Sequence, residues 1–354
     1  MRGRNVMDQQ KILKVGVISC SGMAKNHMYA IRNNNRAHLS AVCDIDAERA
    51  EAAAEEYGVK NVYKDYRDLL KQPDIDAVVV CTPDQLHREM VLAALEAGKH
   101  VLCEKPMALT LEDCREMVEA GRKSDRKLMI GQICRYTPGF RLAKELIDKG
   151  EIGELFYVES EYAHDYSKIL GVGNWRRDPL RHGFLGGGCH PVDLLRWIAG
   201  NPYEVTAYSN KKVLTDLPTD DCTIAIMRFP KDVIGKVFVS IGCKRAYTMR
   251  SVFYGSRGTI IADNTTPHLT VFKEDVAQGD SLFENIERHS TPILYPVALS
   301  SHNTIGEFNE FCDIVLGGGE VRTTAAEGAS TVAACLAAVE SAKTGKAFRP
   351  DYNF

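Results

Sequence analysis

The sequence predicts a two-domain α/β protein, with a doubly wound parallel-sheet domain over residues 1–131 and an α/β domain with a large, mostly antiparallel sheet over residues 132–354. The chain has 354 residues, more than the roughly 250–300 at which one hydrophobic core stops growing. Short β-branched runs alternate with helical stretches in the first part, which is typical of parallel βαβ units. Longer segments with period-2 alternation follow, which is typical of antiparallel strands with one covered face.

The expected strands of the first domain are short and apolar, and helical stretches separate them. The strands are predicted at Lys14–Ser19, Leu39–Asp44, Ala77–Thr82, His100–Cys103 and Leu128–Gln132. The helices are predicted at Met23–Asn33, Ala47–Tyr57, Arg88–Ala97 and Leu111–Lys123. This order of elements indicates a doubly wound dinucleotide fold.

In the second domain, alternating apolar and polar residues predict strands, and two helices are expected to cover their sheet. The strands are expected at Leu155–Tyr162, Asp221–Phe229 and Gly235–Cys243. The covering helices are expected at Asp193–Ala199 and Ala325–Ala342. The second sheet is therefore predicted to be mixed or antiparallel.

Composition argues against several classes of protein. The net charge is -3 and the basic residues are spread along the chain, so no basic stripe suits a nucleic acid. Neither a secretory signal nor a run of about 18 apolar residues is found, so we expect a cytoplasmic protein with no membrane partner. The 11 cysteines form no C-x-x-C pair, which favours free thiols over disulfides. No metal site is expected, since ligand spacing is absent.

A candidate phosphate-binding turn follows the first predicted strand. Compared with the pattern G-x-G-x-x-G/A, Ser19 and Ser21 replace the first two glycines, Gly22 and Met23 follow, and Ala24 fits the last position. Such a turn lets the backbone approach a pyrophosphate at a helix N-terminus. The turn alone is a weak signal, because an ordinary strand-to-helix connection also accounts for it.

Asp44 supports a dinucleotide site, because it ends the second predicted strand 20 residues beyond Ala24. A carboxylate at this position accepts hydrogen bonds from the ribose hydroxyls and repels a 2′-phosphate. NAD is therefore favoured over NADP. Asp46 is expected to cap the following helix instead.

The segment Thr82–Thr110 (TPDQLHREMVLAALEAGKHVLCEKPMALT) resembles the hallmark of the glucose-fructose oxidoreductase, inositol dehydrogenase and MocA family of NAD(P)-dependent oxidoreductases. The likeness continues through Gly131–Leu155, Gly186–Gly200, Phe253–Ile260 and Glu340–Pro350, so it covers nearly the whole chain. The resemblance implies an enzyme that acts on CH–OH groups with a nicotinamide cofactor. It also implies a homodimer or homotetramer.

The resemblance also implies roles for residues of the first domain. The cofactor is expected to contact Thr82, Pro83, His87, Glu104, Lys105 and Gln132. Lys105 matches the family's catalytic lysine. An ammonium group beside the dinucleotide can hold an alcohol oxygen and exchange a proton with it.

Two further residues share one helical turn. His190 and Asp193 are three positions apart, which places them on one helix face. The resemblance makes His190 the acid/base partner of Lys105 and Asp193 a ligand for a substrate hydroxyl. Many family members carry an Asp four residues before this His, but here the position is Gly186. Either Asp165 or Asp178 replaces it, or Lys105 and His190 act alone.

A polar stretch, residues 164–182, is expected to carry substrate contacts, because long loops of this composition often have functions. Trp175 offers a flat face for a ring, and Arg176 and its neighbour Arg177 offer guanidinium groups. His164 and Tyr136 are further candidates for the pocket.

We therefore expect an oxidoreductase that moves hydride between a secondary alcohol of a sugar, glycoside or cyclitol and the nicotinamide. An alternative is a redox-assisted lyase or hydrolase that keeps NAD bound and consumes none. A third class is a non-catalytic sensor, which the presence of Lys105, His190 and Asp193 disfavours.

Overall fold

The computed structural model describes residues 11–171, 174–273, 292–300 and 302–354 and divides into two compact units. The first unit comprises the described residues of Met1–Ala108, Glu112–Gly131 and Thr304–Ala326. The second comprises Leu109–Leu111, the described residues of Gln132–Asn303, and Glu327–Phe354. The chain therefore crosses from the first unit to the second between Gly131 and Gln132, and it returns to the first unit over Thr304–Ala326.

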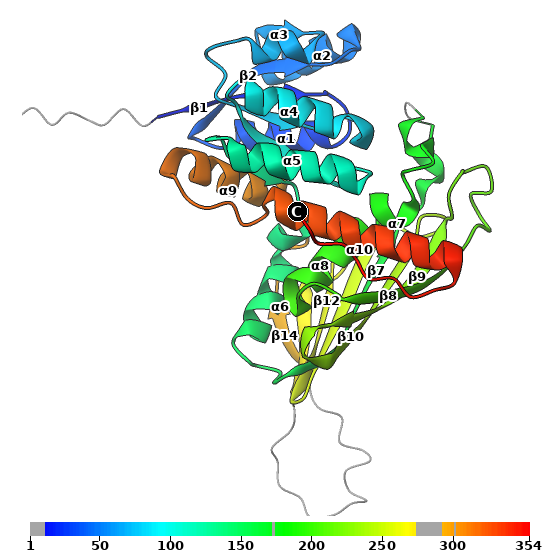
Figure 1. Ribbon diagram of the computed structural model, residues 1–354. Helices are drawn as coiled ribbons and strands as arrows, with labels where there is room; N and C mark the ends of the chain where they lie inside the picture. The colour runs from blue at the N-terminus through cyan, green and yellow to red at the C-terminus, as the bar shows by residue number, and fades with distance from the viewer. Residues whose placement is uncertain (1–10, 172–173, 274–291, 301) are drawn as a thin grey trace, which may run out of the picture. The chain divides into compact units, whose positions relative to one another are not determined.

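The first unit contains a six-stranded sheet in the order β3-β2-β1-β4-β5-β6. Figure 1 labels β1 and β2 of this sheet and the helices α1 to α5 and α9 of the same unit. Every neighbouring pair is parallel. The strands are β1 (Leu13–Ile18), β2 (Ala37–Cys43), β3 (Asn61–Tyr63), β4 (Ala77–Val80), β5 (His100–Cys103) and β6 (Leu128–Ile130). The helices are α1 (Met23–Arg32), α2 (Ala47–Tyr57), α3 (Tyr66–Leu70), α4 (His87–Glu96), α5 (Leu111–Lys123) and α9 (Thr304–Gly317). The predicted doubly wound fold is confirmed.

Local signals explain where these elements begin and end. Asp46 caps α2 by accepting a hydrogen bond from the backbone N–H of Arg49, and Gly58 ends the helix with φ of 71°. Glycine adopts this left-handed conformation without a steric cost. The sequence did not predict β3 and α3, because three and five residues are too few to show a hydrophobic period.

The second unit contains an eight-stranded sheet in the order β14-β13-β12-β11-β7-β10-β9-β8. The strands β7 and β10 pair in parallel, and the other neighbours are antiparallel. The strands are β7 (Leu155–Ala163), β8 (Glu204–Asn210), β9 (Cys222–Phe229), β10 (Val233–Ser240), β11 (Thr248–Gly255), β12 (Gly258–Asp263), β13 (His268–Lys273) and β14 (Ile293–Pro296). The sheet is therefore mixed and mostly antiparallel, as expected.

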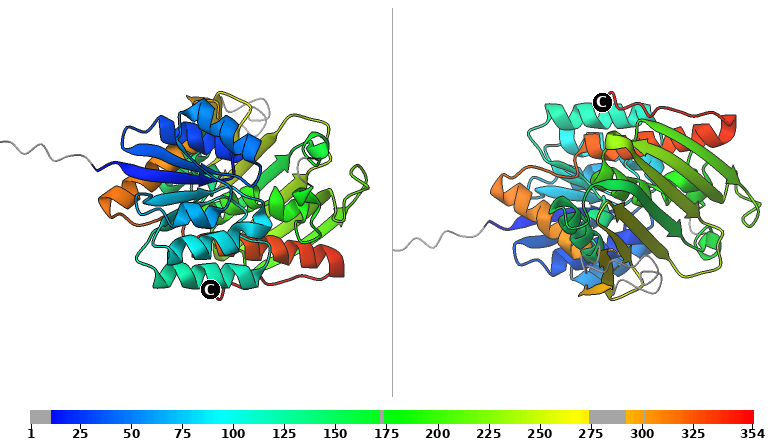
Figure 2. Two further views of the ribbon diagram at one scale, coloured as in Figure 1. Left: turned by 90° about the horizontal axis from the view of Figure 1, so that it is seen from above. Right: turned by 90° about the horizontal axis from the view of Figure 1, so that it is seen from below.

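Helices α6 (Pro138–Asp148), α8 (Cys189–Ala199) and α10 (Ala325–Thr344) lie against one face of this sheet (Figure 2). Burial alternates along β9, where Ala225 and Met227 are buried and Ile224 and Ile226 are exposed. The hydroxyl of Ser341 on α10 accepts a hydrogen bond from the backbone N–H of Ala207 on β8 at 2.9 Å. One face therefore forms the core of the second unit, and the other carries exposed apolar side chains.

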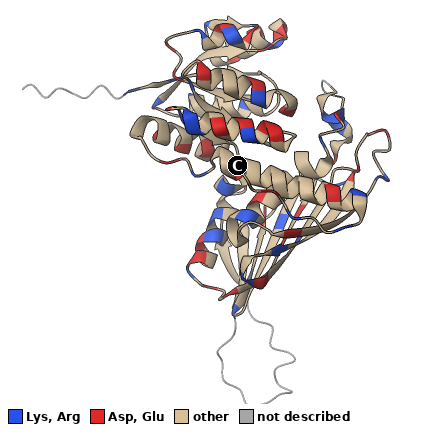
Figure 3. Ribbon diagram, in the orientation of Figure 1, with Lys and Arg blue, Asp and Glu red and all other residues tan. Residues whose placement is uncertain are grey.

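Charged residues of both signs are interspersed over the described part of each unit (Figure 3). The 11 cysteines are free thiols, as predicted. No described helix combines the length and apolar character that crossing a membrane requires.

Candidate active site

The turn after β1 has the backbone conformation that close approach to a phosphate needs. Ser19 has φ of 83° and Gly22 has φ of 52°, so a serine occupies a position that normally favours glycine. The hydroxyls of Ser19 and Ser21 lie 3.2 Å apart. No side chain caps the N-terminus of α1. The backbone N–H groups of Ala24 and Lys25 donate to the carbonyl oxygens of Ser21 and Gly22, so an anion at this turn would be favoured mainly by the positive end of the helix dipole.

Asp44 lies at the end of β2, beside this turn. Its Oδ2 accepts hydrogen bonds from the backbone N–H of Cys20 at 2.9 Å and from Nε of Arg49 at 3.0 Å. Its Oδ1 accepts one from the backbone N–H of Asp46 at 3.0 Å. The carboxylate is therefore fixed next to the loop, and it also holds an arginine that could otherwise face a phosphate.

Replacing Asp44 with Ser is expected to raise the ratio of kcat/KM with NADP to kcat/KM with NAD by about tenfold or more. A tenfold change corresponds to about 1.4 kcal/mol. The variant loses the carboxylate that repels a 2′-phosphate and releases the guanidinium of Arg49. The measurement is kcat/KM for both cofactors, with the helix-capping Asp46→Ser as the matched control. A wild-type enzyme that already prefers NADP would contradict the role of Asp44.

The ends of β4 and β5 bring several predicted cofactor residues together. The imidazole of His87 lies 3.0 Å from the carbonyl oxygens of both Thr82 and Pro106, so it joins the two strand ends. The peptide bond between Lys105 and Pro106 is cis. The hydroxyl of Thr82 is buried without a hydrogen-bond partner in the described structure. His87 thus holds the backbone around Lys105, while Thr82 offers a hydroxyl to a ligand.

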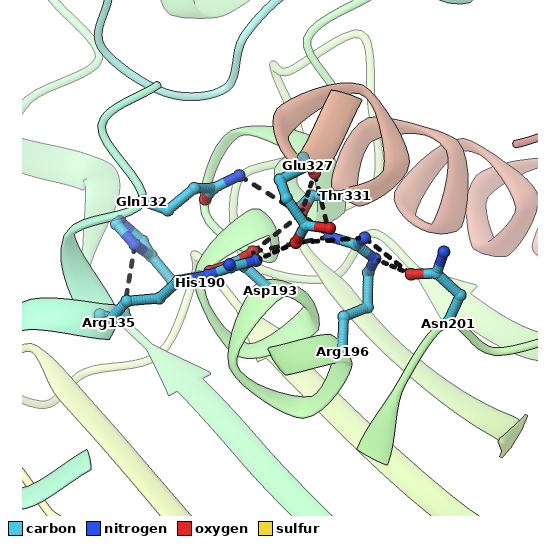
Figure 4. A network of polar contacts seen from close by, with 9 residues as sticks. Gln132, Arg135, His190, Asp193, Arg196, Asn201, Glu327 and Thr331 are labelled. Atoms are coloured by element: carbon cyan, nitrogen blue, oxygen red, sulfur yellow. Dashed lines mark hydrogen bonds and ion pairs between the residues drawn. The ribbon is translucent and has the colours of Figure 1, made fainter. Parts of the chain in front are cut away.

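Asp193 belongs to a buried ion-pair network in the second unit (Figure 4). Its two oxygens accept hydrogen bonds from Nη2 and Nε of Arg135 at 2.6 and 2.9 Å. Arg135 Nη2 also contacts Glu327 Oε2 at 2.6 Å. The hydroxyl of Thr331 donates to Asp193 at 3.1 Å and accepts from the side-chain amide of Gln132 at 3.3 Å.

In this network Asp193 stabilises the packing of α8. The carboxylate is 1% exposed, and the guanidinium of Arg196 lies 3.6 Å from it. These contacts connect α8, α10 and the segment around Arg135. Asp193 therefore fixes the helix that carries His190, and Gln132 also lies in this network. The substrate contact of Asp193 and the cofactor contact of Gln132 stay predictions.

His190 lies within a cluster of aromatic rings. The Tyr162 ring stacks on it with centroids 5.8 Å apart and planes at 16°, and His302 meets it edge-on at 5.5 Å. Its Nδ1 lies 3.5 Å from Sγ of Cys134. The phenol of Tyr162 contacts Nδ1 of His164 at 3.1 Å. The predicted residues His190 and His164 are therefore linked through Tyr162.

Tyr162 and Tyr247 were not predicted as site residues. Burial raises the pKa of both phenols well above the ordinary value. Neighbouring tyrosines raise the pKa of Tyr162 further, and Cys134 and Tyr166 raise that of Tyr247. The hydroxyl of Tyr247 is buried and has no hydrogen-bond partner in the described structure, and its ring stacks on His302 at 5.2 Å. Tyr247 thus offers a neutral hydroxyl beside the histidines. The two-residue spacing of Tyr162 and His164 was the available sequence signal, since alternate residues share a strand face.

Gly186 cannot be replaced by the usual aspartate without rearrangement. A Cβ at this position would lie 2.4 Å from Nη1 of Arg181, far inside van der Waals contact. The buried guanidinium of Arg181 thus occupies the place of the missing side chain. The carboxylates proposed as replacements are bonded elsewhere: Asp165 to Lys244 and the backbone of Ser167, and Asp178 to the backbone of Leu180.

Two other predicted site residues, Trp175 and Tyr136, also belong to the second unit. Trp175 carries the guanidinium groups of Arg176 and Arg181 at 4.1 and 4.6 Å from its ring centroid. Guanidinium groups thus contact the ring of Trp175, whose flat face was expected to receive a sugar or nicotinamide ring. Tyr136 is 3% exposed, and its carbonyl oxygen accepts a hydrogen bond from Asn303 at 3.0 Å.

Both units match known families. Residues 13–132 match the model of an oxidoreductase family with an NAD-binding Rossmann fold. Residues 140–261 match the model of the GFO/IDH/MocA C-terminal domain. The chain belongs to the GFO/IDH/MocA family. It is therefore an NAD-binding oxidoreductase, and the family expected from the Thr82–Thr110 segment is confirmed.

Named relatives include enzymes that act on polyhydroxylated molecules. A myo-inositol 2-dehydrogenase from Thermotoga maritima is 30% identical over 279 residues, which are 76% of this chain and 80% of the relative. A 1,5-anhydro-D-fructose reductase from Ensifer adhaerens is 30% identical over 344 residues, or 94% and 97% of the two chains. Among solved structures, a levoglucosan dehydrogenase in complex with NADH has a TM-score of 0.86 at 26% identity. That alignment covers 96% of this GFO/IDH/MocA chain and 100% of the other.

Proposed function

We propose that this protein is an NAD-dependent dehydrogenase that oxidises a secondary alcohol of a sugar, glycoside or cyclitol. The observation that carries the proposal is the position of Lys105, two residues beyond the end of β5. In a parallel sheet the carboxyl ends of neighbouring strands meet at one edge, so Lys105 shares its edge with the turn after β1 and with Thr82. The relatives named for inositol, anhydrofructose and levoglucosan support this substrate class.

The residues of the cofactor half fit NAD. The uncapped N-terminus of α1 and the turn at Gly22 suit a pyrophosphate, and Asp44 suits the ribose hydroxyls. NAD, when bound, accepts the hydride that leaves the alcohol carbon. The hydroxyl of Thr82 is a further donor without a partner in the described structure. The chain supplies binding and orientation for this group.

In this proposal Lys105 and His190 accept the proton of the alcohol. As hydride leaves the carbon, the alcohol O–H bond breaks and its proton passes to the neutral amine of Lys105 or to the imidazole of His190. The carbon–oxygen single bond becomes a carbonyl, and the alcohol has then lost one hydride to NAD and one proton to the protein. Stacking on Tyr162 and contact with Cys134 fix the ring of His190. The hydroxyl of Tyr247 is positioned to bind a substrate hydroxyl.

The test is the rate of NADH formation when the purified protein and NAD are offered hexoses, glycosides and inositols. A signal that depends on Lys105 supports the dehydrogenase and identifies the substrate class. Silence across the panel, together with NAD that co-purifies, would overturn the proposal. It would favour the redox-assisted lyase or hydrolase, for which the missing carboxylate at Gly186 is the one structural argument.

We further propose that the exposed sheet face pairs subunits in a homo-oligomer. Tyr208, Ile224 and Phe238 form one cross-strand row on this face, and Tyr208 is 73% exposed. Exposed apolar side chains that adjoin one another are typical of an interface between proteins. Ile226 and Ile234 extend the patch.

Replacing Ile224 with Lys is expected to convert the oligomer into monomers, because a charge in an apolar interface core loses its hydration. The measurement is the molar mass by light scattering after size-exclusion chromatography. Lys236→Arg, on the same face, is the matched control and retains the wild-type mass. A wild-type protein that is already monomeric would contradict the interface.

A further inference from the structure

Three polar side chains from distant parts of the chain are buried together in the first unit. They are His27 on α1, Glu104 at the end of β5, and Glu307 on α9, and their nearest polar atoms all lie within 4.8 Å of one another. His27 and Glu307 are fully buried, and Glu104 is 7% exposed. Buried carboxyl groups are costly unless they are paired or neutral, so this cluster needs a physical explanation.

The position of Glu307 is fixed by contacts that hold α9 against the loop after α1. The side-chain amide of Asn34 donates to Asn309 Oδ1 at 2.8 Å, and Arg36 forms an ion pair with Asp313. A Cβ on Gly131 would lie 3.6 Å from Glu307 Oε1 and 3.3 Å from the carbonyl oxygen of Cys103. A glycine therefore leaves the carboxyl room beside the end of β5.

The two carboxyl groups have different surroundings. Glu104 Oε1 lies 2.8 Å from Nε2 of His27, and Oε2 accepts a hydrogen bond from the backbone N–H of Lys105 at 3.1 Å. A carboxylate only accepts hydrogen bonds, so Nε2 of His27 carries the hydrogen. Neither oxygen of Glu307 has a hydrogen-bond partner in the described structure.

We propose that Glu307 is a positioning residue that remains a neutral carboxylic acid, so that Glu104 is the single ionised carboxylate beside Lys105. Two carboxylates that share a buried site do not both ionise, because their like charges repel. Glu104 is the ionised member, since a backbone N–H donates to one of its oxygens and the His27 imidazole meets the other, whereas neither oxygen of Glu307 has a hydrogen-bond partner in the described structure. The charge of Glu104 raises the affinity of the neighbouring Lys105 for a proton. The effect of this charge on catalysis rests on the proposed function of Lys105.

The electrostatics of the neighbouring groups agree with this assignment. Burial and the charge of Glu104 raise the pKa of Glu307 well above its usual range, against the opposing charge of Lys105. Burial acts against ionisation of Glu104, but His27 and Lys105 outweigh it and lower its pKa. The adjacent thiols of Cys81 and Cys103 are neutral, since burial raises the pKa of both. Glu310, also on α9, contributes a smaller repulsion to Glu307.

Infrared spectroscopy tests the protonation state without any substrate. The carbonyl stretch of a protonated carboxylic acid is separate from the bands of ionised carboxylates. At pH 7 to 8 we expect this band in the wild type and its loss in Glu307→Gln. Glu310→Gln is the matched control, because its carboxylate is ion-paired with Arg322 and its replacement leaves the band in place.

A band that is missing from the wild type, or that survives in Glu307→Gln, overturns the proposal. A divalent cation bound by the three side chains would produce the first of these results, since both carboxyls would then be ionised. If Glu307→Gln does not fold, the wild type still gives a decision from pH 5 to 8. The band stays constant if the acid is neutral and disappears on raising the pH if it ionises.

The pH profile of kcat/KM tests the consequence for Lys105. Glu104→Gln removes the negative charge beside the ammonium, so we expect the lysine-dependent limb to move down by about one pH unit, a tenfold change in proton affinity. Glu307→Gln replaces a neutral group with a neutral group, so this limb keeps its position. An equal downward shift in Glu307→Gln overturns the proposal. If no variant or wild type turns over any alcohol, the proposed function fails, and the infrared result still stands by itself.

Discussion

Replacing Lys105 with Met is expected to lower kcat by about 10²- to 10⁴-fold, the usual contribution of a positioned acid or base. The dissociation constant for NAD is expected to stay within about tenfold of wild type, since the amine of Lys105 accepts the alcohol proton and does not anchor the cofactor. Methionine keeps most of the length of the side chain and removes the group that exchanges a proton. The measurements are steady-state kinetics with the best alcohol and NAD binding by fluorescence.

The control for this variant is Lys71→Met, whose lysine is exposed on the surface and pairs with Asp68. We expect this variant to keep wild-type kinetics. Unchanged turnover in Lys105→Met would remove Lys105 from the proposed chemistry. A parallel loss of NAD binding would instead indicate that the lysine anchors the cofactor.

Replacing Arg135 with Leu is expected to lower the free energy of unfolding of the second unit by about 3–5 kcal/mol, the cost of breaking a buried ion pair. The side chain is 8% exposed and contacts both Asp193 and Glu327. Its loss leaves the carboxylate of Asp193, which is 1% exposed, with much of its charge uncompensated. The measurement is urea unfolding followed by circular dichroism.

Arg228→Leu is the matched control, because its partner Glu204 lies 3.8 Å away at the surface and its own side chain is 53% exposed. We expect a loss of at most about 1 kcal/mol for such a pair. Adding Asp193→Asn to Arg135→Leu is expected to cost less than the sum of the single losses, because the two side chains share one interaction. A loss below about 1 kcal/mol in Arg135→Leu would contradict a stabilising function of the network.

Several features of the protein were determined by the sequence alone. The helix α2 begins and ends at the predicted residues because an aspartate cap and a glycine stop are local signals. The strand at His100–Cys103 was also predicted with the observed bounds, since a short apolar run between turn residues is a local signal. Lys105 and Glu104 were singled out by the resemblance of the Thr82–Thr110 segment to the family, and not by their place after this strand.

Other features depended on contacts between distant residues. The segment Thr304–Ala326 returns to the first unit, and no local pattern indicates which sheet a helix will join. Glu307 therefore looks like an ordinary acid of an exposed helix, although it is fully buried beside Glu104. Tyr247 looks like an ordinary loop residue, although its hydroxyl lies buried among histidine rings.

The sequence by itself determined the two sheets, the family and the residues at the strand ends, because these depend on local periodicity and on motifs with fixed spacing. Only the tertiary structure decided that Asp193 is bound by Arg135, that Arg181 occupies the place beside Gly186, and that Glu307 meets Glu104. The physical reason is that hydrogen bonding and charge depend on which side chains meet in space. A protonation state or an ion pair depends on several residues that meet in the folded protein, so it cannot be predicted from any one position in the sequence.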